Sequence, residues 1–218
     1  MWHASIMRVD HVSYAAEQGG LRETAKRLSE ALGVEAVDGG VHPRFGTRNM
    51  ILPLADRQYV EVVEVLDHPA SDKAPFGQAV RARSEDGGGW LGWVVAVDDL
   101  GPAEQRLGRE AAQGNRHRPD GVELRWKQIG VKGLISDPQL PFLVQWEIEE
   151  DLHPSAGGPA DVHLKCLQIA GDPRRVTDWL GLPDDYRPQS VDFEFVAPHG
   201  TPGLLSCRFE TPAGPVTI

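Results

Sequence analysis

Histidine and glutamate side chains occur inside two short apolar runs near the start of the chain. His11 lies in "RVDHVSYAA", and Glu61 and Glu64 lie in "YVEVVEV" further along. Imidazole nitrogens and carboxylate oxygens can bind a divalent metal, and both groups can also accept or donate a proton. The same side chains can instead be hydrogen-bonded or solvated strand residues, so their arrangement has to distinguish these roles.

The alternation of side chains along a strand sorts these residues by face. His11 is expected to point away from the face that carries Asp10. In the second run Glu61 shares a face with Tyr59, and Glu64 lies on the opposite face. Only one of the two glutamates can therefore face a given pocket.

A polar stretch between the two runs supplies further candidates. The segment "GGVHPRFGTRN" contains His42, Arg44 and Asn49 beside glycines that permit tight turns. It is predicted to form either the polar rim of a cleft or a plain connection between strands, in which Asn49 satisfies backbone groups. His42 is the candidate for proton transfer or substrate contact, because the usual pKa of histidine lies near neutrality.

Four of the six tryptophans lie close together in the middle of the chain, at positions 90, 93, 126 and 146. Each taken alone is predicted to be a core residue. Together they would also suit the wall of a cleft for an apolar or planar ligand. The predicted substrate contacts are His42, Arg44, Asn49, Trp93 and Trp146.

These residues need a scaffold, and the first part of the chain predicts one of alternating elements. "VDHVSYAA" predicts a strand, and "GLRETAKRLSEALG" predicts a helix because its apolar residues recur at helical spacing before Gly33. Three β-rich runs follow, separated by turn residues: "VEAVDGGVHPRFG", "TRNMILPLA" and "QYVEVVEVLD". The order of this first module is βαβββ.

The same order recurs from residue 89. "GWLGWVVAVDDL" predicts a strand, "GPAEQRLGREAAQG" predicts a helix, and "VELRWKQIGV", "GLISD" and "LPFLVQWEIEE" predict three strands. After a Pro/Gly-rich break at 151–161, a shortened βαββ segment is predicted. We therefore predict an α+β protein with two regions: paired modules in residues 1–150, and a smaller segment in residues 160–218 packed on them.

Composition limits the partners and the compartment. The 218 residues carry a formal net charge of −10, which disfavours nucleic-acid binding because such surfaces rely on basic residues. No apolar run approaches the roughly 20 residues of a membrane-spanning helix, and "MWHASIM" lacks the basic flank and apolar stretch of a secretion signal. We expect a cytoplasmic protein whose partner is a small molecule, not nucleic acid or a membrane.

The combined pattern resembles a known superfamily. Tandem βαβββ modules with a histidine on the first strand and a glutamate on the fourth are similar to the vicinal oxygen chelate superfamily of glyoxalase, bleomycin resistance and dioxygenase proteins. More narrowly, "DHVSYAA", "HPRFGTRNMILPL", "YVEVVEV" and "LPFLVQW" resemble bacterial glyoxalase-like domain proteins. The resemblance implies curved, open sheets around a cleft, and a divalent metal with one ligand from each of four strands.

Carried over by position, the resemblance implies His11 and Glu61 as the first two metal ligands. The third position falls at Trp93, whose indole has no lone pair for a metal. The fourth falls at Gln145, or at Glu147 if the strand face is displaced by two residues. A Zn, Ni, Mn or Fe ion is therefore expected to bind weakly or not at all.

Three functional hypotheses follow from this resemblance, which by itself does not decide whether the protein is an enzyme. The first is a metal-dependent lyase, isomerase or dioxygenase acting on a small oxygenated substrate, with Glu61 and His42 as catalytic candidates. The second is a metal-free protein that binds or sequesters a small molecule, which Trp93 at the third ligand position favours. The third is an interaction module whose C-terminal segment covers a sheet edge or pairs two subunits as a homodimer.

Overall fold

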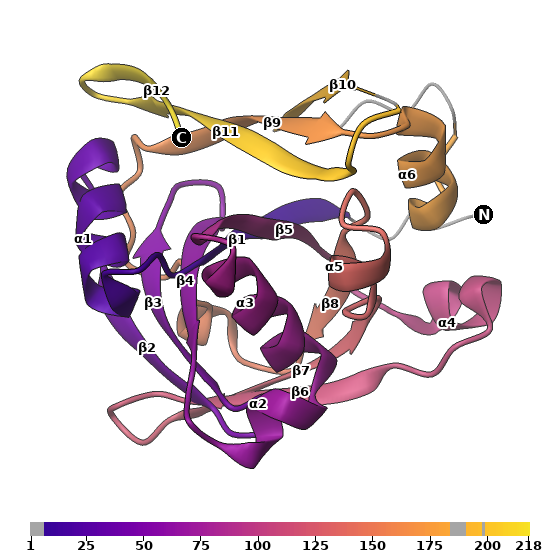
Figure 1. Cartoon of the computed structure of the whole chain (residues 1–218), viewed down its shortest axis with the longest axis horizontal. Coiled ribbons are helices and arrows are strands. Elements are labelled where there is room, and N and C mark those ends of the chain that lie inside the picture. Colours follow the sequence, from indigo (N-terminus) through magenta and orange to yellow (C-terminus); the bar gives the residue numbers. More distant parts are fainter. Residues whose placement is uncertain (1–6, 184–190, 198) are drawn as a thin grey trace.

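A closed barrel of eight strands forms most of the computed structural model, which describes residues 7–183, 191–197 and 199–218 (Figure 1). The predicted regions also include residues 1–6, 184–190 and 198, which lie outside the described residues. The first module consists of β1 (Arg8–Ala15), α1 (Gly20–Leu32), β2 (Val37–His42), β3 (Thr47–Pro53) and β4 (Tyr59–Val65). The predicted βαβββ order is confirmed.

Helix α1 forms where its apolar side chains share one face. Leu21, Ala25, Leu28 and Leu32 are buried, and they join the core outside the barrel. Gly33 ends the helix in the left-handed region at φ 68°, where its N–H bonds to the carbonyl of Ser29. No helix in the described part of the chain is long and apolar enough to cross a membrane.

The second module repeats the order with one insertion. Its elements are β5 (Gly89–Ala96), α4 (Gly101–Leu107), β6 (Ala112–His117), β7 (Glu123–Ile129), α5 (Gly133–Ser136) and β8 (Phe142–Trp146). Two assignments within it were wrong. The helix predicted over 101–114 ends at Leu107, because Gly108 adopts φ 60°, and β6 begins soon after. "GLISD", predicted as a strand, forms the short helix α5.

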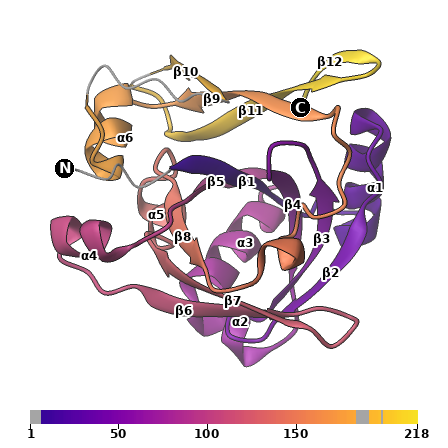
Figure 2. The same ribbon diagram turned by 180° about the vertical axis from the view of Figure 1, so that it is seen from behind.

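Two helices that the sequence analysis did not predict connect the modules, α2 (Pro69–Lys73) and α3 (Pro75–Glu85). Seen along the shared axis of the two views, α3 overlaps the ring of strands and lies nearer the viewer in Figure 1 than in Figure 2. Its buried residues Phe76, Ala79 and Val80 belong to the core cluster inside the barrel. The buried face of α3 therefore contributes to the core inside the barrel.

The two sheets close on each other, although they were expected to be open. The strand order is β1-β4-β3-β2-β6-β7-β8-β5, and β1 pairs with β5 along its length. At the other seam β2 and β6 meet at the pair Val41 and His117. A Cβ on Gly40, which has φ 100°, would lie 1.9 Å from the carbonyl oxygen of His117. The glycine permits this close approach, so the barrel can close.

The C-terminal segment forms a separate sheet beside β1 and β5 (Figures 1 and 2). It contains β9 (His163–Ala170), α6 (Pro173–Leu180), β10 (Asp192–Val196), β11 (Gly203–Thr211) and β12 (Gly214–Thr217), in the order β10-β9-β11-β12. The predicted βαββ pattern is present, with β12 as an additional strand. Its first strand is parallel to its second, whereas β1 is parallel to β4, so the segment is not a third copy of the module.

The barrel and the C-terminal sheet share one hydrophobic core. Val12 and Trp93 on the outer face of the barrel belong to the same buried cluster as Leu167 and Phe209 of the sheet. The division into regions 1–150 and 160–218 stays a prediction.

Trp93 lies in this shared core and not in a cleft, so its predicted substrate contact is wrong. The side chain is 0% exposed, its Nε1 donates to the carbonyl of Gln139 at 3.0 Å, and its ring lies 5.0 Å from that of Phe193. Trp93 pairs with Val12 on β1, and both side chains point outward.

Replacing Trp93 should weaken the packing between the barrel and the C-terminal sheet and leave the barrel interior unchanged. Trp93→Ala is expected to lower the free energy of unfolding by about 3 to 5 kcal/mol, as for large buried aromatic residues. Trp93→Phe should cost less, since it keeps most of the packing and loses the hydrogen bond to Gln139. Urea denaturation measures both values. A loss below about 1 kcal/mol for the alanine variant would mean that the layers do not depend on this contact.

Candidate functional site

A pocket opens inside the barrel. Its lining consists of His11, His42, Phe45, Tyr59, Glu61, Phe76, Arg116, Trp126, Gln128, Phe142, Val144 and Trp146. Its empty space is about 430 Å³, open solvent at the mouth included. Aromatic rings make up much of the wall, and the polar groups are few, which is typical of sites for small organic molecules.

A β-bulge in β1 places the side chain of Asp10 beside that of His11, which lines the pocket. Val9 pairs with Val95 of β5, and His11 pairs with the adjacent Val94, so Asp10 is an extra residue on β1. Asp10 and His11 were predicted to face opposite ways. That prediction was wrong because a bulge interrupts the alternation of side chains.

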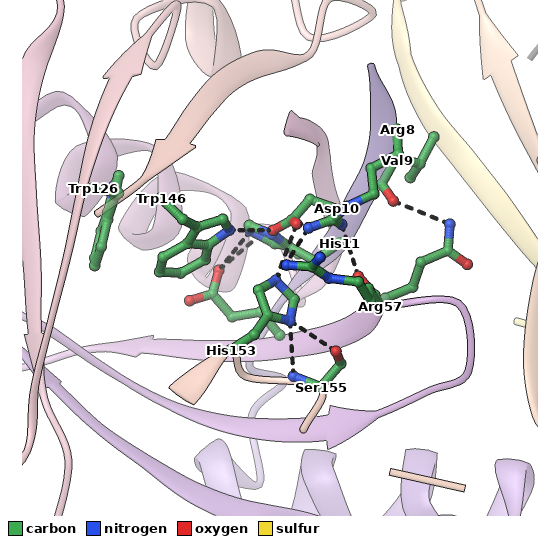
Figure 3. A network of polar contacts seen from close by, with 12 residues as sticks. Arg8, Val9, Asp10, His11, Arg57, Trp126, Trp146, His153 and Ser155 are labelled. Carbon is green, nitrogen blue, oxygen red and sulfur yellow. Dashed lines mark hydrogen bonds and ion pairs between the residues drawn. The ribbon is translucent and has the colours of Figure 1, made fainter. Parts of the chain in front are cut away.

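The carboxylate of Asp10 is completely buried and is surrounded by donors (Figure 3). Its Oδ1 lies 2.6 Å from Nη1 of Arg8 and 3.2 Å from Nε2 of His153. Its Oδ2 lies 3.0 Å from Nδ1 of His11 and accepts from Nε1 of Trp146 at 3.2 Å. Burial alone would raise the pKa of Asp10, but the bonds from both histidines and the Arg8 charge hold that pKa far below its usual range. The group is therefore ionised.

An ionised carboxylate fixes the tautomer of His11. Since Asp10 can only accept, Nδ1 of His11 must carry a proton, and in the neutral ring Nε2 keeps its lone pair. Nε2 lies 4.0 Å from Oε2 of Glu61. The ring stacks on Tyr59 with the centroids 4.4 Å apart and the planes 16° from parallel. In the neutral ring, Nε2 is therefore the nitrogen that can accept a proton.

His153 reaches the same carboxylate from the segment that follows the short 3₁₀ helix η1 (Glu150–Leu152). Its Nδ1 accepts from the backbone N–H of Ser155 at 3.2 Å and lies 2.7 Å from the Ser155 hydroxyl, so the proton of the neutral ring sits on Nε2. Burial lowers the pKa of His153, although Asp10 opposes this. His153 therefore acts as a neutral donor to Asp10.

Glu61 is held by two donors from neighbouring strands. Its Oε1 accepts from Nδ2 of Asn49 at 2.7 Å, and its Oε2 accepts from the hydroxyl of Ser13 at 2.8 Å. Burial opposes ionisation, yet the pKa of Glu61 lies below its usual value because the His42 and His11 rings and these two donors favour the carboxylate. Asn49 therefore positions Glu61, and it is not among the pocket-lining residues.

His42 lies in the aromatic part of the wall. Its Nδ1 is 3.0 Å from the hydroxyl of Thr47, and its Nε2 is 3.7 Å from Oε1 of Glu61. Burial lowers the pKa of His42 to about 4, while the Glu61 charge opposes this shift and the Arg116 charge adds to it. The ring is therefore neutral at neutral pH.

Arg116 enters the pocket from β6 and was not predicted. It is 3% exposed, and its Nη1 donates to Oδ1 of Asn49 over a long 3.4 Å. Its Nε has no partner among the described residues. Arg116 was missed because no strand was predicted over 112–117, a run without any large apolar side chain.

The remaining predicted site residues are placed as follows. Trp146 lines the pocket, as do His11, His42 and Glu61, while their roles remain predictions. Arg44 lies exposed in the turn between β2 and β3, where its neighbour Phe45 faces the pocket instead. Gln145 points outward, and its Oε1 accepts from the N–H of Leu100. Glu147 pairs with Lys127 at 3.5 Å.

The residues of the pocket do not fit a four-ligand metal site. Beside His11 on β5 stands Val94, and the position on β8 that repeats Glu61 is Val144, which pairs with Ala96 as Glu61 pairs with Ser13. Neither valine can bind a metal. The described part of the chain contains no cluster of three or more His, Cys, Asp or Glu side chains that could hold a metal. The prediction of Gln145 as a metal ligand is wrong, because its side chain faces away from the pocket.

Phe76 and Asp10 were both missed, but only Phe76 lies in a sequence pattern that could have predicted its position. Phe76 follows Pro75 at the start of a run with Ala79 and Val80 at helical spacing, a pattern that would have predicted α3. No such pattern exists for Asp10, since nothing in the sequence indicates the bulge.

The chain is similar to one family model and to several solved structures. A family model described as "Glyoxalase-like domain" matches residues 9–182. A hypothetical protein from Staphylococcus aureus is 15% identical with a TM-score of 0.65, over 94% of this chain and 91% of that one. A methylmalonyl-CoA epimerase from Mycobacterium tuberculosis is 15% identical with a TM-score of 0.45, over 70% and 95%. A search of curated proteins gives no match. The Staphylococcus likeness supports the fold.

Stability should depend on pH through His42. The pKa of an unfolded histidine is about 6.5, and the fold lowers that of His42 to about 4. Between these values the unfolded chain binds a proton that the folded chain does not, so the free energy of unfolding falls as the pH falls, by roughly 3 kcal/mol in total. Urea denaturation of the wild type and His42→Gln at pH 4.5, 5.5 and 6.5 measures this, and the variant should show the shallower slope.

The exposed His117 provides the matched control, since His117→Gln should keep the wild-type slope. An unchanged slope in His42→Gln would assign the effect to another group.

Metal titration tests the ligand count. Zn, Ni and Mn are expected to bind weakly, and His11→Ala should abolish this binding, because replacing a lost ligand by water leaves the ion less firmly held. Elemental analysis after dialysis against a chelator should find no stoichiometric metal. A metal that survives dialysis would show that the ligands were undercounted, and equal weak binding by His11→Ala would exclude His11 as a ligand.

Proposed function

The chain belongs to the glyoxalase-like domain family, and from this premise we propose that it is an enzyme that moves a proton on a small oxygenated substrate inside the barrel. In this proposal His11 is the acid–base residue. The Asp10–His11 pair is the observation that supports this role. The fully buried carboxylate of Asp10 lies 3.0 Å from Nδ1 of His11, which leaves Nε2 as the free nitrogen of the ring.

Asp10 supports this chemistry in two ways. It fixes the tautomer, and its negative charge stabilises the imidazolium that forms when Nε2 accepts a proton. The ionised Glu61, 4.0 Å from Nε2, stabilises the same cation. Asn49 and Ser13 hold Glu61 in this place.

The reaction that suits these groups is proton transfer at a carbon next to a carbonyl. His11 would remove the C–H proton, and the electron pair of that bond would form an enolate. The imidazolium would then return a proton to the same carbon or to a neighbouring atom of the enolate, which completes an isomerisation without any further reactant. The aromatic wall keeps water away from the charged intermediate.

The divalent metal that the superfamily resemblance implied has no part in this proposal, because Val94 and Val144 stand where further ligands would be needed. A second candidate function is metal-free binding or sequestration of a small molecule. The predominance of aromatic rings in the wall favours it. Turnover distinguishes the two functions.

Deuterium exchange tests the proposed enzyme. A panel of small α-keto and β-keto acids is incubated with the protein in D₂O, and NMR follows deuterium at the carbon next to the carbonyl. Wild type is expected to accelerate exchange on at least one compound, and His11→Gln should lower that rate by about 100-fold or more, as for loss of a general base. Asp10→Asn should lower it and shift its pH profile, because Asp10 acts through His11.

His117→Gln, a surface histidine variant, is the control and should exchange at the wild-type rate. Equal exchange by wild type and a folded His11→Gln would remove His11 from the chemistry. Saturable binding of panel compounds without any exchange would favour sequestration.

A further inference from the structure

We propose that the ligand of this pocket is a monocarboxylate with a planar or apolar body, and that Arg116 binds its carboxylate. The inference deepens the proposed function, since it names the substrate class for the same pocket. It stands on a different observation, an arginine that lacks the partners its burial requires.

Arg116 is buried but poorly paired. Only 3% of its surface is exposed, its one hydrogen bond among the described residues is the 3.4 Å contact with Asn49, and Nε has no partner. Glu61, the carboxylate in the same pocket, accepts its hydrogen bonds from Asn49 and Ser13 and not from Arg116. A guanidinium stays charged in proteins, and a buried charge without a partner is costly. A bound anion would supply the missing partner.

The backbone around Arg116 is shaped to leave it room. Gly39 on β2 faces it, and a Cβ at that position would lie 2.1 Å from Oδ1 of Asn49 and 3.0 Å from Nη1 of Arg116. Any larger residue at position 39 would therefore push the arginine and Asn49 away. This arrangement indicates a built position for the guanidinium.

The charges of the pocket favour a single negative charge on the ligand. Arg116 is the unpaired cation of the lining, whereas Asp10 and Glu61 are ionised and Arg8 already offsets Asp10. The ionised Glu61 repels a dianion such as a phosphate monoester about twice as strongly as it repels a monoanion at the same distance. A carboxylate carries one charge, and its two oxygens match the fork of a guanidinium.

The rest of the wall defines the body of the ligand. Phe45, Tyr59, Phe76, Trp126, Phe142 and Trp146 line the pocket together with Val144. Such a wall stabilises a flat or apolar group by contact and offers it few hydrogen bonds. A carboxylate attached to a planar or hydrocarbon group satisfies both parts of the pocket.

Benzoate and its neutral analogue benzamide are suitable probes. Their binding to the full chain can be followed by the fluorescence of Trp126 and Trp146, and checked by calorimetry. Wild type is expected to bind benzoate about 10- to 100-fold more tightly than benzamide, the range for hydrogen bonds to a charged group. Arg116→Gln should lose this preference, and Arg116→Lys should keep part of it.

Arg125→Gln is the matched control, because Arg125 is an exposed arginine on the neighbouring strand that pairs with Glu123. It should bind both probes as wild type does. Circular dichroism and urea denaturation show whether each variant is folded. The comparison of the two probes on wild type needs no variant, so it decides the question even if Arg116→Gln does not fold.

Three results would overturn the inference: no saturable benzoate binding to wild type, equal affinity for benzoate and benzamide, or unchanged benzoate affinity in a folded Arg116→Gln. Benzoate has no proton to exchange next to its carboxyl group, so its binding is independent of catalysis. A protein that binds benzoate through Arg116 but never exchanges deuterium keeps this inference and loses the proposed function. One that exchanges deuterium but does not prefer benzoate does the reverse.

Discussion

Four donors meet at the carboxylate of Asp10, two from its own strand and two from distant parts of the chain. Arg8 and His11 belong to β1, Trp146 ends β8, and His153 follows η1. A buried carboxylate costs several kcal/mol unless such partners are present. The fold therefore has to bring the end of β8 and the segment after it against β1, and the same contacts fix the ring of His11. The site and the fold depend on one set of bonds.

The two modules contribute different things to the pocket despite their common order. The first supplies most of the polar groups: His11, His42 and Glu61, with Asn49 and Ser13 behind them. The second supplies mainly apolar and aromatic wall, together with Arg116 and Gln128. Where a symmetric pair of modules could place ligands on both sides, this chain places valines on one. The division separates a polar half from a half that excludes water.

Features that follow from the regular alternation of side chains were predicted from the sequence. Positions where that alternation is interrupted or absent were not. The βαβββ order and the placement of Glu61 with Tyr59 followed from strand and helix periodicity. Asp10 was misplaced because a bulge adds one residue to β1. Trp93 was misplaced because β5 is buried on both faces, so its apolar run has no alternation that would indicate a side. Arg116 was missed because β6 carries few apolar residues.

Strand β1 is enclosed on all sides. It is hydrogen-bonded to β4 on one edge and β5 on the other, its inner face lines the pocket, and its outer face joins the core beneath the C-terminal sheet. Amide hydrogens in such a strand exchange with solvent only through the largest opening events of a protein. Asp10 and His11 are therefore expected to lie in the part of the molecule that opens most slowly.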